Sequence, residues 1–212
     1  MLQIETFILN PFQENSYLIW ETDFGEALLI DAGCYEKHEF EMVEHFLSEH
    51  ELTLTGLANT HCHIDHILGV PYFRNSYNLP FRAHKDESRL VQNAHLMGKI
   101  FGLNVQPFPE LDSFIEPGDE IRVGTHIFQA IHVPGHSQGS LSFYCREAGI
   151  VLTGDALFRG SIGRTDLPGG NYDQLIHSIQ NNLFVLPPET EVYPGHGESS
   201  TIAIELDSNP YF

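Results

Sequence analysis

Short stretches rich in apolar and β-branched residues recur along the chain, bounded by Gly, Pro, Asn or Asp. That pattern predicts strands. They span residues 3–9, 17–21, 27–31, 54–59, 81–84, 120–123, 126–133, 141–145, 150–153 and 191–193. Asp23-Phe24-Gly25 separates the second stretch from the third and predicts a hairpin between them.

Other segments repeat their apolar residues with helical spacing. Residues 36–51 place Phe40, Val43 and Phe46 on one face, which predicts a helix. Further helices are predicted for 68–77, for a segment capped by Asp86 and reaching residue 101, for 171–183 with Asn171 as its cap, and for 201–206.

Strands gather toward both ends of this order of elements, and helices lie between them. Such an order favours two packed sheets with helices outside over an alternating parallel sheet, so the predicted fold class is α+β. At 212 residues the chain suits one domain, and we expect residues 1–212 to form it.

The charge balance limits the partners. The chain has 10 basic and 29 acidic residues and a net charge of −19. This argues against nucleic acid and against anionic membranes as partners. The expected partner is a small-molecule substrate. The three cysteines form no obvious disulfide framework, the N-terminus lacks a signal-peptide pattern, and no stretch reaches the roughly 20 apolar residues of a membrane helix. We therefore expect a cytoplasmic protein.

The most unusual segment is His61-Cys62-His63-Ile64-Asp65-His66, with three imidazoles and one carboxylate in six residues. Neutral imidazole and carboxylate are ligands that borderline divalent metals prefer. The alternative is a polar loop whose histidines are solvated. Cys62 between the donors is expected to pack as a small apolar residue.

Three further donors follow strands, each directly after a glycine. They are His136 in Pro-Gly-His, Asp155 in Thr-Gly-Asp and His196 in Pro-Gly-His-Gly. Glycine allows the sharp turn that aims the next side chain inward. Seven potential donors exceed one tetrahedral site and suit two sites that share a carboxylate.

Together these motifs resemble the full set of the metallo-β-lactamase superfamily, and Asp31 in Asp-Ala-Gly matches its early Asp-x-Gly turn. The resemblance implies an αββα sandwich with two divalent metal ions at one edge. Zinc is the first expectation, and iron or manganese are possible with the same ligands. It assigns His61, His63 and His136 to one metal, Asp65, His66 and His196 to the other, and Asp155 to both. Asp31 is expected to hydrogen-bond a ligand such as His61 or His63.

Residues 154–170 and the Gly-His-Gly ending are similar to the glyoxalase II-like group. The chain departs from the full-length enzymes, since it lacks their C-terminal helical extension for glutathione and has Gly197-Glu198 where they carry a tyrosine. Arg164 falls roughly where they bind the glycine carboxylate of glutathione. Its alternative role is a salt bridge to Asp166.

The resemblance implies hydrolysis of a thioester or ester, such as S-lactoylglutathione, by a hydroxide held between two metals. Asp65 and Asp155 are the expected catalytic residues, Asp65 by orienting the hydroxide and taking up its proton. Two other functions stay open: a single-iron persulfide dioxygenase of the same fold, and a non-catalytic metal-binding module. Residues 90–111 form either a wall over the site or ordinary core.

Overall fold

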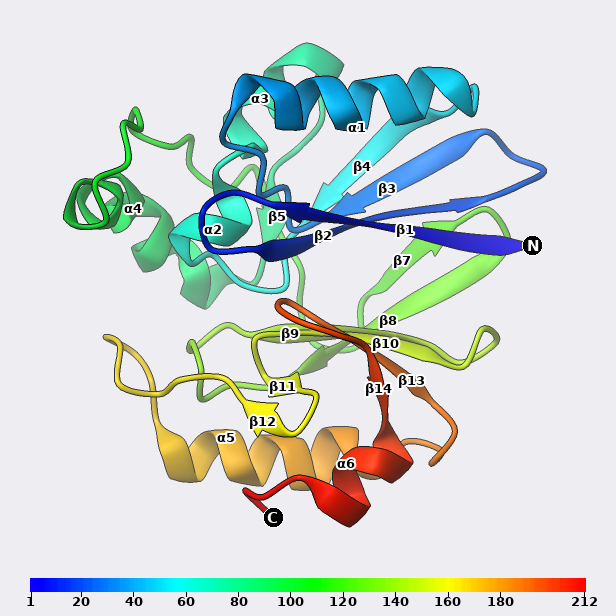
Figure 1. The fold of residues 1–212 in the computed structure, drawn as a ribbon, viewed down its shortest axis with the longest axis vertical. Coiled ribbons are helices and arrows are strands. Elements are labelled where there is room, and N and C mark those ends of the chain that lie inside the picture. Colours follow the sequence, from blue (N-terminus) through cyan, green and yellow to red (C-terminus); the bar gives the residue numbers. More distant parts are fainter.

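Two β-sheets form the centre of the computed structural model, which describes residues 1–212 (Figure 1). The first sheet has the order β1-β2-β3-β4, in which only the β3–β4 pair is parallel. Its strands are β1 (Leu2–Leu9), β2 (Glu14–Glu21), β3 (Glu26–Ile30) and β4 (Thr53–Ala58). The predicted hairpin joins β2 to β3.

The second sheet has the order β14-β13-β10-β9-β8-β7, in which only the β10–β13 pair is parallel. Its strands are β7 (Glu120–Val123), β8 (His126–His132), β9 (Leu141–Cys145), β10 (Ile150–Gly154), β13 (Glu191–Pro194) and β14 (Ser200–Thr201). Two small pairs complete the strands: β5 (Arg82–Ala83) with β6 (Ser113–Phe114), and β11 (Leu157–Phe158) with β12 (Ser161–Ile162). The four strands missing from the prediction, β6, β11, β12 and β14, have two residues each, too few to show a period.

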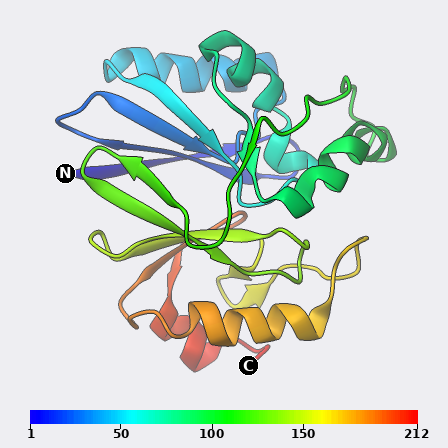
Figure 2. The same ribbon diagram turned by 180° about the vertical axis from the view of Figure 1, so that it is seen from behind.

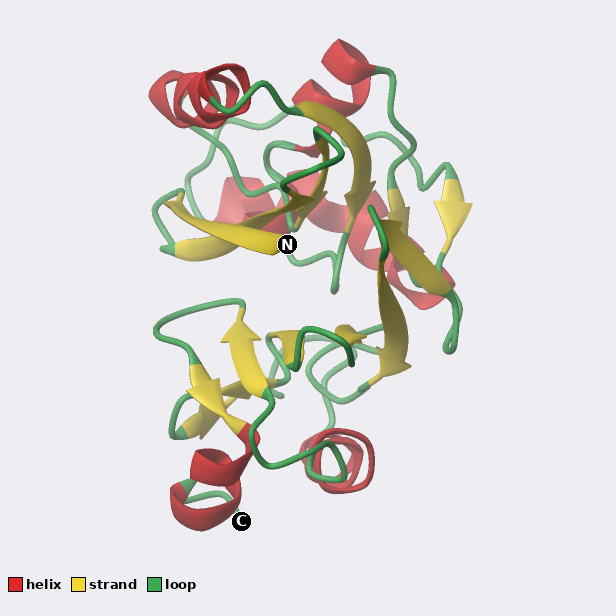
Figure 3. Cartoon of the chain, turned by 90° about the vertical axis from the view of Figure 1, so that its right-hand side faces the viewer, coloured by secondary structure: helices red, strands yellow, loops and turns green.

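Helices cover the outer face of each sheet (Figures 1, 2 and 3). On the side of the first sheet lie α1 (Lys37–Glu49), α2 (Ile64–Ile67), α3 (Val70–Tyr77) and α4 (Ser88–Ile100). On the side of the second lie α5 (Tyr172–Ser178), continued by a π-helical turn (Ile179–Leu183), and α6 (Ile202–Ser208). The predicted αββα arrangement is confirmed. None of these helices has the length and apolarity needed to cross a membrane.

The alternation of side chains along β2 shows how the layers are held together. Leu18 and Trp20 point into an apolar cluster beneath α1, which includes Val43. Tyr17 and Ile19 point the other way, into a second cluster between the two sheets. Because both faces of β2 are covered, every residue of this strand is buried.

The start of α4 differs from the prediction. A 3₁₀ turn (Lys85–Glu87) precedes the helix, and the His84 ring nitrogen Nδ1 accepts the Asp86 amide at 3.3 Å. Asp86 therefore lies inside the turn that His84 caps, and α4 starts only after Glu87, whose side chain makes no cap hydrogen bond. The prediction that Asp86 caps α4 is wrong, because the turn separates it from the start of the helix. The other predicted cap is confirmed, since Asn171 Oδ1 accepts the Gln174 amide at 3.0 Å.

Candidate metal centre

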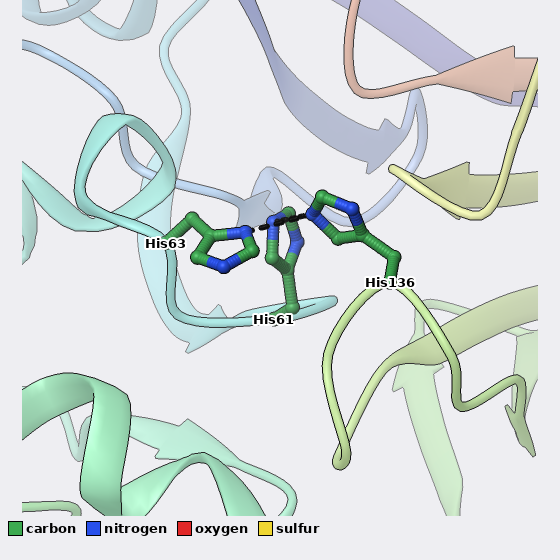
Figure 4. Close-up of side chains that lie close together, drawn as sticks. All are labelled: His61, His63 and His136. Carbon is green, nitrogen blue, oxygen red and sulfur yellow. Dashed lines mark hydrogen bonds between the residues drawn. The ribbon is translucent and has the colours of Figure 1, made fainter. Parts of the chain in front are cut away.

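The seven predicted donors meet at one edge of the sandwich, where β4, β8, β10 and β13 end. Figure 4 shows His61, His63 and His136 facing one another from two separate turns. His136 Nε2 lies 2.7 Å from His63 Nδ1 and 3.1 Å from His61 Nε2. Three ring nitrogens aimed at one point form a set of donors that one cation can share.

A second set of donors lies beside the first. Asp65 Oδ2 is 3.2 Å from His196 Nε2 and 3.8 Å from His66 Nε2. Asp65 and His66 come from the short helix α2, whereas His196 lies in the turn after β13. The chain thus brings together donors that are separated by 130 residues.

Asp155 lies between the two sets. Its Oδ1 is 3.3 Å from His66 Nε2, and its Oδ2 is 3.6 Å from both His136 Nε2 and His196 Nε2. One carboxylate therefore contacts members of both sets, as a ligand shared by two cations would have to do.

Oxygen acceptors fix the orientation of three of the rings. Nδ1 of His66 lies 3.1 Å from an Asp31 oxygen, Nδ1 of His136 lies 2.8 Å from the Arg164 carbonyl, and Nδ1 of His196 lies 3.3 Å from the Gln13 carbonyl. An Nδ1–H held in this way turns Nε2 toward the site, which is how metal-binding histidines are usually oriented.

Asp31 supports the site differently from the prediction. It accepts the Thr60 amide at 2.7 Å and the Thr60 hydroxyl at 2.6 Å, and its direct contact with a donor is to His66. His61 is reached only through Thr60, whose hydroxyl is 3.2 Å from His61 Nδ1. Asp31 therefore contacts a predicted ligand, as expected, but that ligand is His66 and not His61 or His63, because Thr60 lies between Asp31 and His61.

The two sets differ in their electrostatics. Burial lowers the pKa of His61 and lowers that of His63 to about 3, so these rings are neutral donors at neutral pH. Burial also acts to lower the pKa of His66, but the carboxylates of Asp155 and Asp65 outweigh it and raise that pKa. A cation bound at the second set would replace the proton on His66.

Unpaired buried atoms show that the residues fit metal ions. His66 Nε2 and Asp155 Oδ1 are both buried, and neither has a hydrogen-bond partner. Leaving polar atoms unpaired in the interior is costly, and native structures rarely do so. A divalent cation held by these residues would satisfy both atoms and would offset the negative charge of Asp65 and Asp155.

Sequence reasoning missed two buried carboxylates beside the site. Glu14 is fully buried, and its Oε1 lies 3.7 Å from His66 Nδ1. Glu87 is fully buried at the end of the 3₁₀ turn and hydrogen-bonds the turns that carry His63 and His136. Glu14 begins β2 ahead of the predicted strand 17–21, and Glu87 ends a short 3₁₀ turn, so neither belongs to a stretch whose periodicity indicated burial.

Arg164 is paired within its own loop. Its Nε and Nη2 donate to the two carboxylate oxygens of Asp166, each at 2.7 Å, and both side chains are exposed. This is the salt bridge that the sequence left as the alternative. Cys62 is buried in the apolar cluster under the first sheet, as expected.

The fold and these donors define a class of proteins, the αββα metallohydrolases. Residues 9–196 match the model of the Metallo-beta-lactamase superfamily. The chain belongs to this superfamily.

Relatives extend over nearly the whole chain. It is similar to the probable metallo-hydrolase YqgX of Bacillus subtilis, at 36% identity over 96% of this chain and 94% of the relative. It is also similar to the hydroxyacylglutathione hydrolase GloC of Haemophilus influenzae, at 32% identity over 99% and 98% of the two chains.

Two solved structures share the fold closely. The BLEG-1 B3 metallo-beta-lactamase superposes with a TM-score of 0.87 at 33% identity, over 99% of each chain. A di-iron-bound form of TTHA1623 superposes with a TM-score of 0.86 at 35% identity, over 98% of this chain and 100% of that one.

Proposed function

We propose that this protein is a hydrolase of thioesters or esters that works with two divalent metal ions, in the manner of glyoxalase II. One observation carries the proposal: the Asp155 carboxylate lies within 3.6 Å of donors from both sets. A single structural ion needs only four ligands, whereas seven donors around a shared carboxylate suit a pair. The similarity to GloC supports the choice of substrate class.

In this proposal His61, His63 and His136 hold one ion, Asp65, His66 and His196 hold the other, and Asp155 binds both. When bound, such ions would supply a hydrolytic nucleophile at neutral pH, since divalent metals lower the pKa of bound water to about 7. We propose zinc as the usual metal, although the di-iron form of TTHA1623 supports iron as an alternative.

The chain's own groups then have defined tasks. Asp65 is partly exposed beside His196, so its free carboxylate oxygen can accept a proton at the open side of the site. Asp31 and the carbonyls of Arg164 and Gln13 hold the rings in place. Arg164 can bind a substrate carboxylate only after it leaves Asp166, so we propose this role for a loop that rearranges when substrate binds.

The test combines elemental analysis of the purified protein with turnover of S-lactoylglutathione, simple thioesters and lactones. We expect two metal ions per chain and thioester hydrolysis that chelation abolishes and metal restores. One iron per chain with oxygen consumption would instead identify the sulfur-oxidising alternative. Two metal ions per chain without hydrolysis of any ester or thioester would favour the remaining alternative, a non-catalytic metal-binding module.

A second reaction deserves the same assay because of the similarity to the BLEG-1 metallo-beta-lactamase. Hydrolysis of a β-lactam amide requires the same kind of polarised carbonyl and hydrolytic nucleophile. A chromogenic cephalosporin hydrolysed faster than any thioester would favour this candidate.

We also propose a cytoplasmic location. Cys34, Cys62 and Cys145 are all buried and free of disulfides, which suits a reducing compartment. Fractionation of the native cells would test it.

A further inference from the structure

A groove of about 450 Å³ opens directly beside His63. One wall is α4, the opposite wall is the segment 167–169, and Ser137 and Gln138 from the turn after β8 lie between them. In Figures 1 and 2, α4 and the segment 160–170 lie at the same end of the molecule, on the helix sides of different sheets. The volume is in the range of pockets that hold small molecules.

Helix α4 has two apolar faces with different partners. Val91 and Ala94 are buried in the core beneath the first sheet. Leu90, Met97 and Ile100 follow one another at helical spacing and line the groove, and Leu90 also packs against the edge of that core. For residues 90–111 the sequence left two alternatives, a wall over the site or ordinary core. The helix in this segment does both.

The groove wall exposes apolar surface that folding alone does not need. Leu96 is 48% exposed and Ile100 is 73% exposed, and Leu167 and Pro168 lie on the facing wall. Large apolar side chains gathered around a hollow are typical of ligand sites.

The groove has no buried, unpaired charge that would bind a charged ligand. Asp86 and Arg89 are both exposed and have opposite charges. Glu87 is buried, but its oxygens already accept hydrogen bonds from Cys62, Ser137 and Gly139. A ligand in this groove therefore meets apolar surface and no unsatisfied buried charge.

We propose that this groove binds an uncharged apolar arm of several carbons, attached to an ester or thioester whose carbonyl lies at the metal centre. The inference rests on the proposed function, because it identifies the class of substrate for that same site. S-lactoylglutathione, with its hydroxyacyl group and charged tripeptide, matches an apolar wall poorly.

Chain length gives the kinetic test. The hexanoyl and acetyl thioesters of N-acetylcysteamine vary the acyl arm, and the S-hexyl and S-methyl esters of thioacetic acid vary the thiol arm. Each buried methylene adds roughly fourfold to binding, and partial burial reduces this, so we expect at least about 10-fold higher kcat/KM for the long member of one series. The series that responds tells which arm occupies the groove.

Two variants make the test specific to the groove. Leu96 on α4 and Leu206 on α6 are each 48% exposed, but only Leu96 lines the groove. We expect Leu96→Gln to lower the long-to-short ratio of kcat/KM at least about threefold, and Met97→Gln to do the same. Leu206→Gln is the matched control and should keep the ratio of the unaltered protein.

A binding measurement separates this inference from the proposed function. Calorimetry with the thioether S-hexyl-N-acetylcysteamine should show at least about 10-fold tighter binding than with the S-methyl thioether, and Leu96→Gln should weaken it. Selective binding without hydrolysis of any thioester would support the groove and overturn the hydrolase. Hydrolysis with equal rates for long and short substrates, or a ratio unchanged in both groove variants, would overturn the groove.

Discussion

The Glu87 carboxylate accepts a hydrogen bond from the backbone amide of Cys62 at 2.7 Å. Its other oxygen accepts the Gly139 amide and the Ser137 hydroxyl, both at 2.8 Å. Cys62 stands between two predicted metal ligands, and Ser137 directly follows a third. One buried side chain thus links the two turns that form the first donor set.

We predict that Glu87→Gln weakens metal binding without unfolding the protein. A glutamine can accept at one oxygen only, so its amide group would face at least one of the three donors. The cost is about 1–3 kcal/mol of stability, and loosening of the supported turns should lower metal affinity or kcat about 10-fold. Thermal unfolding and a metal titration measure the two effects.

The control for Glu87 is Glu110→Gln, which alters an exposed glutamate. It should leave both quantities unchanged. Unaltered metal affinity in Glu87→Gln would show that the link between the two turns is not needed.

Asn15 should matter for the second donor set in a similar way. Its side-chain amide donates to the carbonyls of Pro194 and Gly197, each at 2.9 Å, and its backbone amide donates to Gly195 at 2.8 Å. These bonds hold the turn that carries His196. We predict that Asn15→Ala costs about 1–3 kcal/mol and lowers the metal content from two toward one per chain.

Elemental analysis after dialysis measures that loss, with Asn104→Ala at an exposed position as the control. Two tightly held ions in Asn15→Ala would contradict the role given to this side chain.

The sequence predicted the site better than it predicted what supports the site. The ligand types and their place after strand ends followed from local motifs, and all seven side chains meet in the structure. Glu14, Glu87 and Asn15 act through contacts with distant segments, and nothing in their own neighbourhood indicates burial. Asp31 shows the intermediate case, since its motif predicted support for a ligand but not that Thr60 would direct it to His66.

The fold, too, could be predicted only in part from the local sequence. In β2 the apolar run of residues 17–20 predicted a strand, whereas the polar residues 14–16, which are also buried, gave no such signal. The glycines before the donors act in two ways that one pattern could not separate. Gly135 and Gly154 have φ values of +134° and +51°, which favour glycine, whereas a Cβ on Gly195 would collide with Asp155.

Asp31→Asn tests whether the Asp31 carboxylate holds the His66 ring in place, without adding backbone strain. Asp31 has a φ of +54°, a conformation that asparagine also tolerates. The amide can no longer accept from the Thr60 amide, the Thr60 hydroxyl and His66 together. We predict a retained fold by circular dichroism and a 10–100-fold weaker affinity for metal. An affinity within twofold of the unaltered protein would contradict this.

Asp112 gives a prediction for stability against pH, away from the metal centre. Its hydrogen bonds from Arg74, at 2.6 and 2.7 Å, and from the Phe81 amide hold its pKa below the ordinary 3.8. A lowered pKa in the folded state means that the contribution to stability is present above pH 3.8 and is lost as the pH falls below it. We predict that Asp112→Asn costs about 1 kcal/mol at pH 7 and much less near pH 3.

Urea unfolding of both proteins across that range measures the difference, and the other titrating groups cancel in the comparison. A cost that stayed constant down to pH 2.5 would show that the charge of Asp112 does not stabilise the fold.

Asp155→Asn tests the shared carboxylate most directly. The substitution keeps the shape of the side chain and removes its charge, between His66 on one side and His136 and His196 on the other. Because a neutral amide bridges two cations poorly, we predict loss of at least one ion and a fall in thioester turnover of at least about 100-fold. Metal content and single-substrate kinetics should be measured on the same preparation, with Asp207→Asn on the exposed face of α6 as the control. A variant that keeps both ions and the full rate would rule out a bridging role for this residue.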